Sequence, residues 1–254
     1  MLSSRASYGG AAGVVDGDSP LGPLMPYCPH CMRIGLLMAE AGVPFETYMI
    51  DGQDKPAWFL DAFPAGTTPA MQGVPGGLAG SDEWVGDFDV IMARAKEQSP
   101  RFAAVASERG PLTTKQAADL VTRTAYAQFA GVMVGTQLDS GKGMMGALMR
   151  QGRIETIEGE GDAALLARII QITADGLAEV ERVLSALPGP FLGGDSPAEP
   201  DAFMATMLFW CHNALECGLS VLPQAPCTLA DVGAPSALRY LQAGRCRLTL
   251  SNPR

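Results

Sequence analysis

The chain has 254 residues, of which 47% are hydrophobic and 18% charged, a composition able to bury a core and unlike that of a disordered chain. Eighteen lysines and arginines stand against 27 aspartates and glutamates, which gives a formal net charge of -9. A chain of this charge has no net attraction for a phosphate backbone or an anionic bilayer, so nucleic-acid binding is disfavoured. The length fits one large domain or two small ones.

No apolar run approaches the roughly 20 residues that a membrane-spanning helix needs. The uncharged stretch 202–215 is too short and contains His212. Residues 1–25 hold no continuous apolar segment, so we expect no secretory signal and a cytoplasmic protein. The serines around Arg5 leave an organelle such as the chloroplast open.

The first part of the chain favours a tail followed by an α/β domain. Residues 1–25 are rich in glycine, alanine, serine and proline and are interpreted as a flexible N-terminal tail. Residues 26–99 then alternate short helix and strand patterns. The elements predicted there are helices over 29–41, 56–63 and 88–97, strands over 43–50 and 83–85, and an extended segment entered through Thr68-Pro69.

Residues 102–254 favour an all-helical domain. Residues 162–187 place leucine, isoleucine and valine at helical spacing, which predicts a long amphipathic helix. We expect the nearly uncharged segment 201–215 to form a central buried helix and residues 235–241 a short terminal one. The glycine-rich segment 139–161 is interpreted as a mobile loop.

The chemistry of the sequence centres on Cys28-Pro29-His30-Cys31. The proline and the helix formers after it place Cys28 at the start of a helix, where unpaired N–H groups and the helix dipole stabilise a thiolate. Cys31 lies three residues further on, close enough to act as a resolving thiol. In a chain without secretory features this spacing indicates thioredoxin-like redox chemistry.

Two other interpretations of the cysteine pair remain open at this point. A zinc site needs a second cysteine or histidine pair, and Cys211, His212 and Cys217 do not supply one at a useful spacing. An inert pair of core cysteines would not need a proline in the second position or a helix start directly after it. Six cysteines are in any case too few for a disulfide scaffold.

Several further segments carry a resemblance to a known family. Besides the CPHC motif, they are Val43-Pro44-Phe45, the DKPAWFL stretch from Asp54, the PAGTTP stretch from Pro64, the WVGDFDVI stretch from Trp84, and the GPFLGG stretch from Gly189 followed by Asp201. In this order they resemble the glutathione-dependent dehydroascorbate reductases, which are related to chloride intracellular channel proteins and omega-class glutathione transferases. The resemblance implies the glutathione transferase fold, a thioredoxin-like α/β N-terminal domain followed by an all-α C-terminal domain.

The resemblance also assigns roles to individual residues. It implies that Cys28 is the nucleophile and that Lys55 meets the glycine carboxylate of glutathione. Thr68 would pair through its backbone with the cysteinyl part, held by a cis Pro69, and Asp87 would lie near the γ-glutamyl end. A cis X-Pro bond exposes the preceding N–H and C=O to a peptide ligand, and lysine is a good partner for a carboxylate.

The sequence departs from the family pattern at several places. Phe88 stands where the family commonly has a serine that holds the γ-glutamyl carboxylate, and Tyr27 stands where an acid is often found. Lys55 is the first lysine of the chain, so the N-terminal strand that usually carries another is hard to place. It is either residues 11–15 or partly missing.

The resemblance implies a monomeric enzyme that reduces dehydroascorbate to ascorbate, with glutathione as co-substrate and no bound cofactor or metal. An omega-like thioltransferase would use the same residues with a different acceptor. A DsbA-type oxidase shares the CPHC motif but inserts its helices before the cis-proline, whereas here the helical region follows Pro69. A chloride-channel-like binding protein without enzymatic activity is a third alternative.

Overall fold

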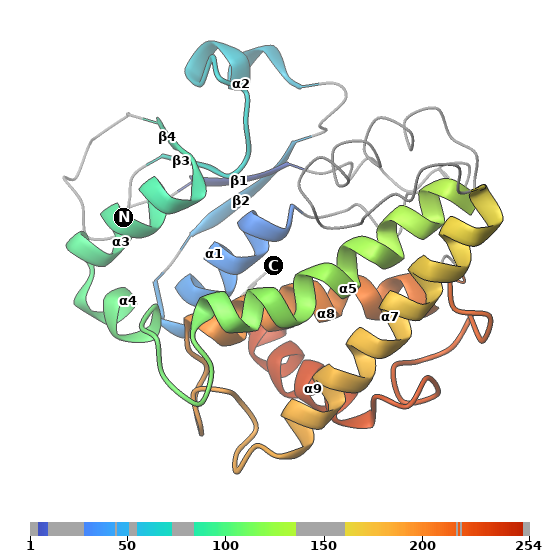
Figure 1. Ribbon diagram of the computed structural model, residues 1–254. Helices are drawn as coiled ribbons and strands as arrows, with labels where there is room; N and C mark the ends of the chain where they lie inside the picture. Colours follow the sequence, from blue (N-terminus) through green and yellow to red (C-terminus); the bar gives the residue numbers. More distant parts are fainter. Residues whose placement is uncertain are drawn as a thin grey trace.

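The computed structural model describes residues 5–9, 28–43, 45–50, 55–72, 84–135, 161–216, 218 and 220–250. An α/β half is followed by a half made of helices, and helix α1 lies between the sheet and the helical half (Figure 1). This is the arrangement that the sequence predicts.

The sheet has four strands in the order β2-β1-β3-β4. Strand β1 (Arg5–Gly9) pairs in parallel with β2 (Glu46–Ile50) and antiparallel with β3 (Ala70–Gln72). Strand β4 (Trp84–Gly86) pairs antiparallel with β3 and forms one edge. The predicted strands near residues 43–50 and 83–85 and the extended segment after Pro69 are thus confirmed.

The N-terminal strand differs from the expectation. A strand lies at Arg5–Gly9, so the predicted tail is wrong for these 5 residues. The strand position considered at residues 11–15 lies outside the described part of the chain. The rest of residues 1–25 lies outside the described part of the chain. The strand is held by pairing along both of its edges, a tertiary effect that overrides weak local propensity.

The helices of the first half cover both faces of the sheet. Alternate strand residues point to opposite faces, so Met71 and Val85 pack in one cluster with α1 (Pro29–Glu40) and α3 (Phe88–Gln98). On the other face, Ala70 packs against Phe59 of α2 (Ala57–Ala62). The short helix α4 (Pro100–Val105) follows α3 directly, with Ser99 capping it. The three helices predicted in this half are confirmed.

The second half contains α5 (Thr114–Gly135), α7 (Asp162–Ser185), α8 (Glu199–Glu216) and α9 (Pro235–Leu250). Helix α8 contacts α1, α5 and α9 and is largely buried, as predicted for a nearly uncharged segment. Helix α9 is longer than the predicted 235–241. It continues through Gly244, because a single glycine inside a helix costs only about 1 kcal/mol and does not end it. Of the predicted mobile loop, 139–160 lies outside the described residues.

Helices α5 and α7 approach each other closely at one point. A Cβ atom at Gly176 of α7 would lie only 1.8 Å from Oγ1 of Thr124 in α5. Position 176 therefore requires glycine for this packing distance.

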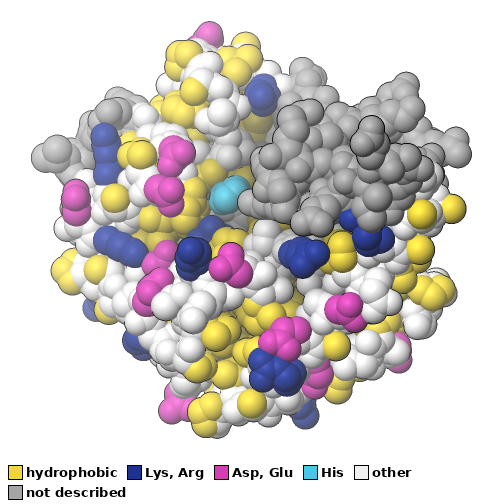
Figure 2. All heavy atoms as spheres, in the orientation of Figure 1, with side chains coloured by type: hydrophobic (Ala, Val, Ile, Leu, Met, Phe, Trp, Pro, Cys, Tyr) yellow, Lys and Arg dark blue, Asp and Glu magenta, His cyan; other side chains and the backbone are white. Residues whose placement is uncertain are grey.

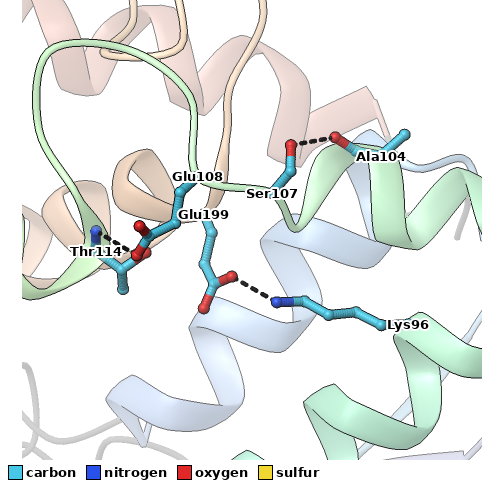
Figure 3. A network of polar contacts seen from close by, with 6 residues as sticks. All are labelled: Lys96, Ala104, Ser107, Glu108, Thr114 and Glu199. Carbon is cyan, nitrogen blue, oxygen red and sulfur yellow. Dashed lines mark hydrogen bonds and ion pairs between the residues drawn. The ribbon is translucent and has the colours of Figure 1, made fainter.

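Two polar groups tie α8 to its surroundings. Nζ of Lys96 in α3 lies 2.8 Å from Oε2 of Glu199 at the start of α8, and Figure 3 shows this ion pair bridging the two helices. The buried Asp201 carboxylate accepts hydrogen bonds from the N–H groups of Leu192, Gly193 and Ala198 and from the hydroxyl of Tyr240. The carboxylate thus receives donors from the preceding loop and from α9.

Within the described residues, none of the helices combines the length and apolar character that crossing a bilayer requires.

Candidate active site

Cys28 occupies the position that opens α1. It is the N-cap residue, in an extended conformation, and its carbonyl accepts the N–H of Met32 at 3.0 Å. Pro29 follows in the first turn, where its missing N–H costs nothing. The Cys28 sulfur therefore lies at the positive end of the helix, as the sequence predicts.

The pKa of the Cys28 thiol is lowered from 9.0 to about 6. The largest cause is a hydrogen bond from the thiol of Cys31. Cys31 is buried, with only 3% of its surface exposed. Burial of the sulfur opposes this, while the backbone N–H groups of Cys31 and His30 and a hydrogen bond from the side chain of Thr68 lower the pKa further. Cys28 is therefore mostly thiolate at neutral pH.

The two cysteines of the helical half whose side chains the structure describes have the opposite character. Burial raises the pKa of Cys211 to about 12, and burial together with the charge of Asp231 raises the pKa of Cys227. A thiol is nucleophilic only as thiolate. Among these three cysteines, only Cys28 is prepared for nucleophilic chemistry.

The second part of the site is the Thr68-Pro69 bond, which is cis. The Thr68 carbonyl oxygen lies 3.9 Å from Sγ of Cys28, so the structure brings the predicted nucleophile and the predicted peptide-pairing residue together. Pro69 leads into β3, whose first residue Ala70 pairs with Gly86 of β4. This register places Asp87, the next residue, at the same end of the sheet.

Asp87 caps α3, with Oδ1 accepting the N–H groups of Asp89 at 2.9 Å and Val90 at 3.4 Å. Its backbone has φ 69 and ψ 132, a combination that a non-glycine residue adopts at a cost on the order of 1–3 kcal/mol. The side chain is exposed. Asp87 thus presents a carboxylate and a strained backbone at the rim of the site.

Lys55 lies just before α2 and is exposed. Its Cδ and Nζ lie 3.7 and 3.9 Å from the place where a Cβ of Gly66 would be. Gly66, with φ +58, begins the turn that leads to Thr68. The ammonium group is therefore next to the cis-proline loop, on its solvent side.

The structure adds a group that the sequence analysis missed. Arg33 of α1 is only 6% exposed, and its guanidinium carbon lies 4.0 Å from the ring centroid of Phe88 and 4.2 Å from that of Phe203 in α8. The Phe88 ring also lies 5.6 Å from the ring of His30. A lone basic residue in the apolar helix pattern 29–41 was the available signal.

The described residues hold no group of three or more histidine, cysteine, aspartate or glutamate side chains that could bind a metal ion. Figure 2 shows a histidine in a recess of the surface, bordered on one side by hydrophobic side chains. The described residues of the site thus combine a thiol of lowered pKa, a cis-proline loop and separate acidic and basic side chains.

Two family models match this chain. Residues 27–98 match the model of the glutathione S-transferase N-terminal domain, and residues 163–243 match that of the C-terminal domain. The chain belongs to the glutathione S-transferase family. The first model contains the cysteine motif, the cis-proline and Asp87, and the second contains α8 and most of α7.

Curated glutathione S-transferases with the name DHAR are similar to parts of the chain. "Glutathione S-transferase DHAR2" of Arabidopsis thaliana is 36% identical over 89 residues, which are 32% of this chain and 38% of that protein. "Probable glutathione S-transferase DHAR4" of the same plant is 26% identical over 189 residues, 74% of this chain and 69% of that protein. The match to the first of these relatives thus spans little more than a third of its length. The resemblance seen in the sequence motifs is confirmed.

Solved structures agree on the fold. The dehydroascorbate reductase of Chlamydomonas reinhardtii has a TM-score of 0.58 at 19% identity, over 99% of this chain and 93% of that one. A glutathione S-transferase of Methylobacillus flagellatus, solved with glutathione bound, also has a TM-score of 0.58, at 16% identity over 99% and 100% of the chains. The predicted fold, a thioredoxin-like domain followed by an all-α domain, is confirmed.

Proposed function

We propose that this chain reduces dehydroascorbate to ascorbate with glutathione as the reductant and Cys28 as the nucleophile. The observation that supports this best is the Cys28 thiol with its pKa near 6, placed against the carbonyl of Thr68 before a cis-proline. A strong nucleophile next to an open peptide edge suits a reaction that exchanges thiols with a peptide thiol such as glutathione.

In the proposed reaction the Cys28 thiolate attacks a carbonyl carbon of dehydroascorbate. A glutathione thiolate then attacks the Cys28 sulfur, the carbon–sulfur bond breaks, its electron pair stays on the substrate, and ascorbate leaves after taking up from solvent the protons that the two thiols had released. Cys28 is left in a mixed disulfide with glutathione. A second glutathione attacks this disulfide, which releases oxidised glutathione and restores the thiolate, in ping-pong order.

The binding roles of the other site residues belong to the same proposal. Lys55 meets the glycine carboxylate of glutathione, the Thr68 backbone before cis Pro69 pairs with the cysteinyl part, and Asp87 faces the γ-glutamyl end. All of these residues come from one chain, which suits a monomer. The reaction needs reduced glutathione, so a cytoplasmic or chloroplast location suits it.

A second function, an omega-like thioltransferase, is supported by the Cys31 thiol. It is buried directly against Cys28, so it could attack a Cys28–glutathione mixed disulfide, release glutathione and form a Cys28–Cys31 disulfide. This route would suit disulfide substrates as well as dehydroascorbate.

The test compares two glutathione-dependent assays of the purified chain, one with dehydroascorbate and one with the mixed disulfide of hydroxyethanethiol. Cys28→Ser should abolish both activities, whereas Cys227→Ser, which removes a half-buried thiol of the helical half, should retain them. Full activity of Cys28→Ser would overturn the proposal. Turnover of the disulfide alone would favour the thioltransferase.

A further inference from the structure

Arg33 is a buried cation with an unusual set of neighbours. Its guanidinium carbon lies within 4.2 Å of two aromatic ring centroids, Phe88 on α3 and Phe203 on α8. The guanidinium therefore joins three helices, with one of them belonging to the helical half. Aromatic faces attract a desolvated cation strongly.

Arg33 remains charged, and none of the ion pairs among the described residues includes it. Burial lowers the pKa of Arg33 to about 10, while the negative charges of Glu199 and Asp89 act against this shift. The Glu199 carboxylate is bonded to Lys96 at 2.8 Å, and within the described part of the chain Nε of Arg33 is buried without a hydrogen-bond acceptor. The stacking on the two rings is therefore a direct favourable contact of this cation within the described residues.

Phe88 directly follows a residue whose backbone conformation is strained. Phe88 is the first residue of α3 and follows Asp87, whose positive φ is unfavourable for a residue with a side chain. Such a conformation persists only where the surroundings hold it. Contacts at this position include the two cap hydrogen bonds of Asp87, the N–H of Ile91 donating to the Asp87 carbonyl at 3.0 Å, and the stack of Phe88 on Arg33.

We propose that Arg33 is a positioning residue for glutathione, which fixes the Asp87 end of the site by clamping the ring of Phe88. Arg33 acts through Phe88 and does not touch glutathione or the reacting sulfur. This inference rests on the proposed function, in which Asp87 faces the γ-glutamyl end. It also gives Phe88 a role. The family serine would offer a hydroxyl to the ligand, whereas Phe88 holds the backbone at Asp87 in place through the contact of its ring with Arg33.

The test is a double-mutant cycle of Arg33→Met and Phe88→Leu, with Arg33→Lys as the conservative variant. Two quantities are measured: the glutathione KM and kcat in the dehydroascorbate assay, and the calorimetric Kd of S-methylglutathione, which cannot form a disulfide. Arg33→Met should raise KM and Kd about five- to thirtyfold, the equivalent of losing a desolvated cation–π contact. Arg33→Lys should lose less, and kcat at saturating glutathione should change less than about twofold.

The cycle decides whether Arg33 acts through Phe88. In the Phe88→Leu background, Arg33→Met should raise KM and Kd less than about twofold further, because the contact is already gone. If Arg33→Met raised KM and Kd by the same factor in the wild-type and Phe88→Leu backgrounds, the inference would be overturned. It would also be overturned if Arg33→Met left KM and Kd unchanged, or if it lowered kcat by as large a factor as it raised KM. If Arg33→Met does not fold, the cycle is run with Arg33→Lys, which should raise KM and Kd by a smaller factor in the wild-type background and by a still smaller factor in the Phe88→Leu background; equal factors in the two backgrounds would overturn the inference.

A failure of the proposed function would look different. A wild-type chain that turns over neither dehydroascorbate nor the disulfide substrate would overturn the proposed function. The Kd of S-methylglutathione would still report the coupling between Arg33 and Phe88. Unchanged affinity of the variants alongside full wild-type turnover would overturn only the role of Arg33.

Discussion

The sulfur of Cys28 lies 3.9 Å from the carbonyl oxygen of Thr68, although 40 positions separate the two residues in the chain. One belongs to the first turn of α1 and the other to the loop before β3. Because α1 packs on the sheet through buried residues such as Ile34 and Met71, the distance between thiol and loop is fixed by the core. The reactivity of Cys28 is therefore a property of the folded protein.

The pH dependence of alkylation tests this reactivity. Only the thiolate reacts with iodoacetamide, and the pKa of Cys28 is about 6. The alkylation rate of Cys28 should therefore rise with pH, reach half its maximum near pH 6 and level off above about pH 7. Mass spectrometry of the peptide that contains Cys28 separates it from the other cysteines. A half-maximum at or above about pH 8.5, the ordinary thiol value, would contradict this prediction.

Removal of the Cys31 thiol should raise the pKa of Cys28, since the hydrogen bond from that thiol is the largest cause of the lowering. Cys31→Ala removes the donor, whereas Cys31→Ser keeps one. The half-maximum of alkylation should move to higher pH in both variants and further in Cys31→Ala. No shift in either variant would show that the Cys31 thiol does not stabilise the thiolate, and equal shifts in both would show that its effect is not a hydrogen bond that serine can replace.

Lys55 is expected to act on glutathione binding alone. Lys55→Met should raise the glutathione KM by about fivefold, because a charge pair at an exposed site contributes about 1 kcal/mol. The maximal rate should stay near that of the wild type. Lys115→Met is the matched control, since Lys115 is also exposed but belongs to α5. A similar rise of KM in Lys115→Met would show that the effect of Lys55→Met comes from the change in net charge and not from a contact with glutathione.

Asp87 combines a cap with a charge, and two variants separate them. Asp87→Ala should lower the free energy of unfolding by about 1 kcal/mol, because the N–H groups of Asp89 and Val90 lose their acceptor. Asp87→Asn keeps an oxygen acceptor and tolerates a positive φ, so its stability should change little. Both should raise the glutathione KM. Urea unfolding measures the change in stability, and steady-state kinetics measure the change in KM. An unchanged KM in Asp87→Asn would show that the charge of Asp87 does not contribute to glutathione binding.

Tyr240→Phe tests the buried carboxylate of the helical half. The Tyr240 hydroxyl donates to Oδ1 of Asp201 at 2.6 Å, and a hydrogen bond to a charged group is worth about 1.5–3 kcal/mol. The variant keeps the ring that packs against Phe191, so the loss isolates the hydroxyl. We expect urea unfolding to show a decrease of this size. A decrease below about 0.5 kcal/mol would mean that Asp201 is satisfied by its three N–H donors.

The order of the elements could be predicted from the sequence because each has a local signal. Proline and the helix formers after it marked the start of α1, and the apolar periodicity marked α7. Strand β1 has no such signal: its pairing partners, β2 and β3, are distant in the chain. The extension of α9 beyond residue 241 was missed for a related reason, since intrinsic propensity is only a weak guide to where a helix ends.

The residues of the candidate site divide in the same way. Cys28, Thr68 and Pro69 could be found because a motif, or a resemblance that spans several motifs, points to them. Arg33 could not be interpreted, because its significance depends on Phe88 and Phe203, which come from two other helices. For the same reason Phe88 looked only like a departure from a pattern.

The close approach of Gly176 to Thr124 limits how the helical half can move. The Thr124 hydroxyl occupies the space that any side chain at position 176 would need. A slide of α7 along α5 would carry the flanking residues, which do have side chains, towards that hydroxyl. This steric contact therefore restricts sliding of α7 along α5 and keeps the two long helices in axial register. A change of shape around a ligand would have to involve other pairs of elements.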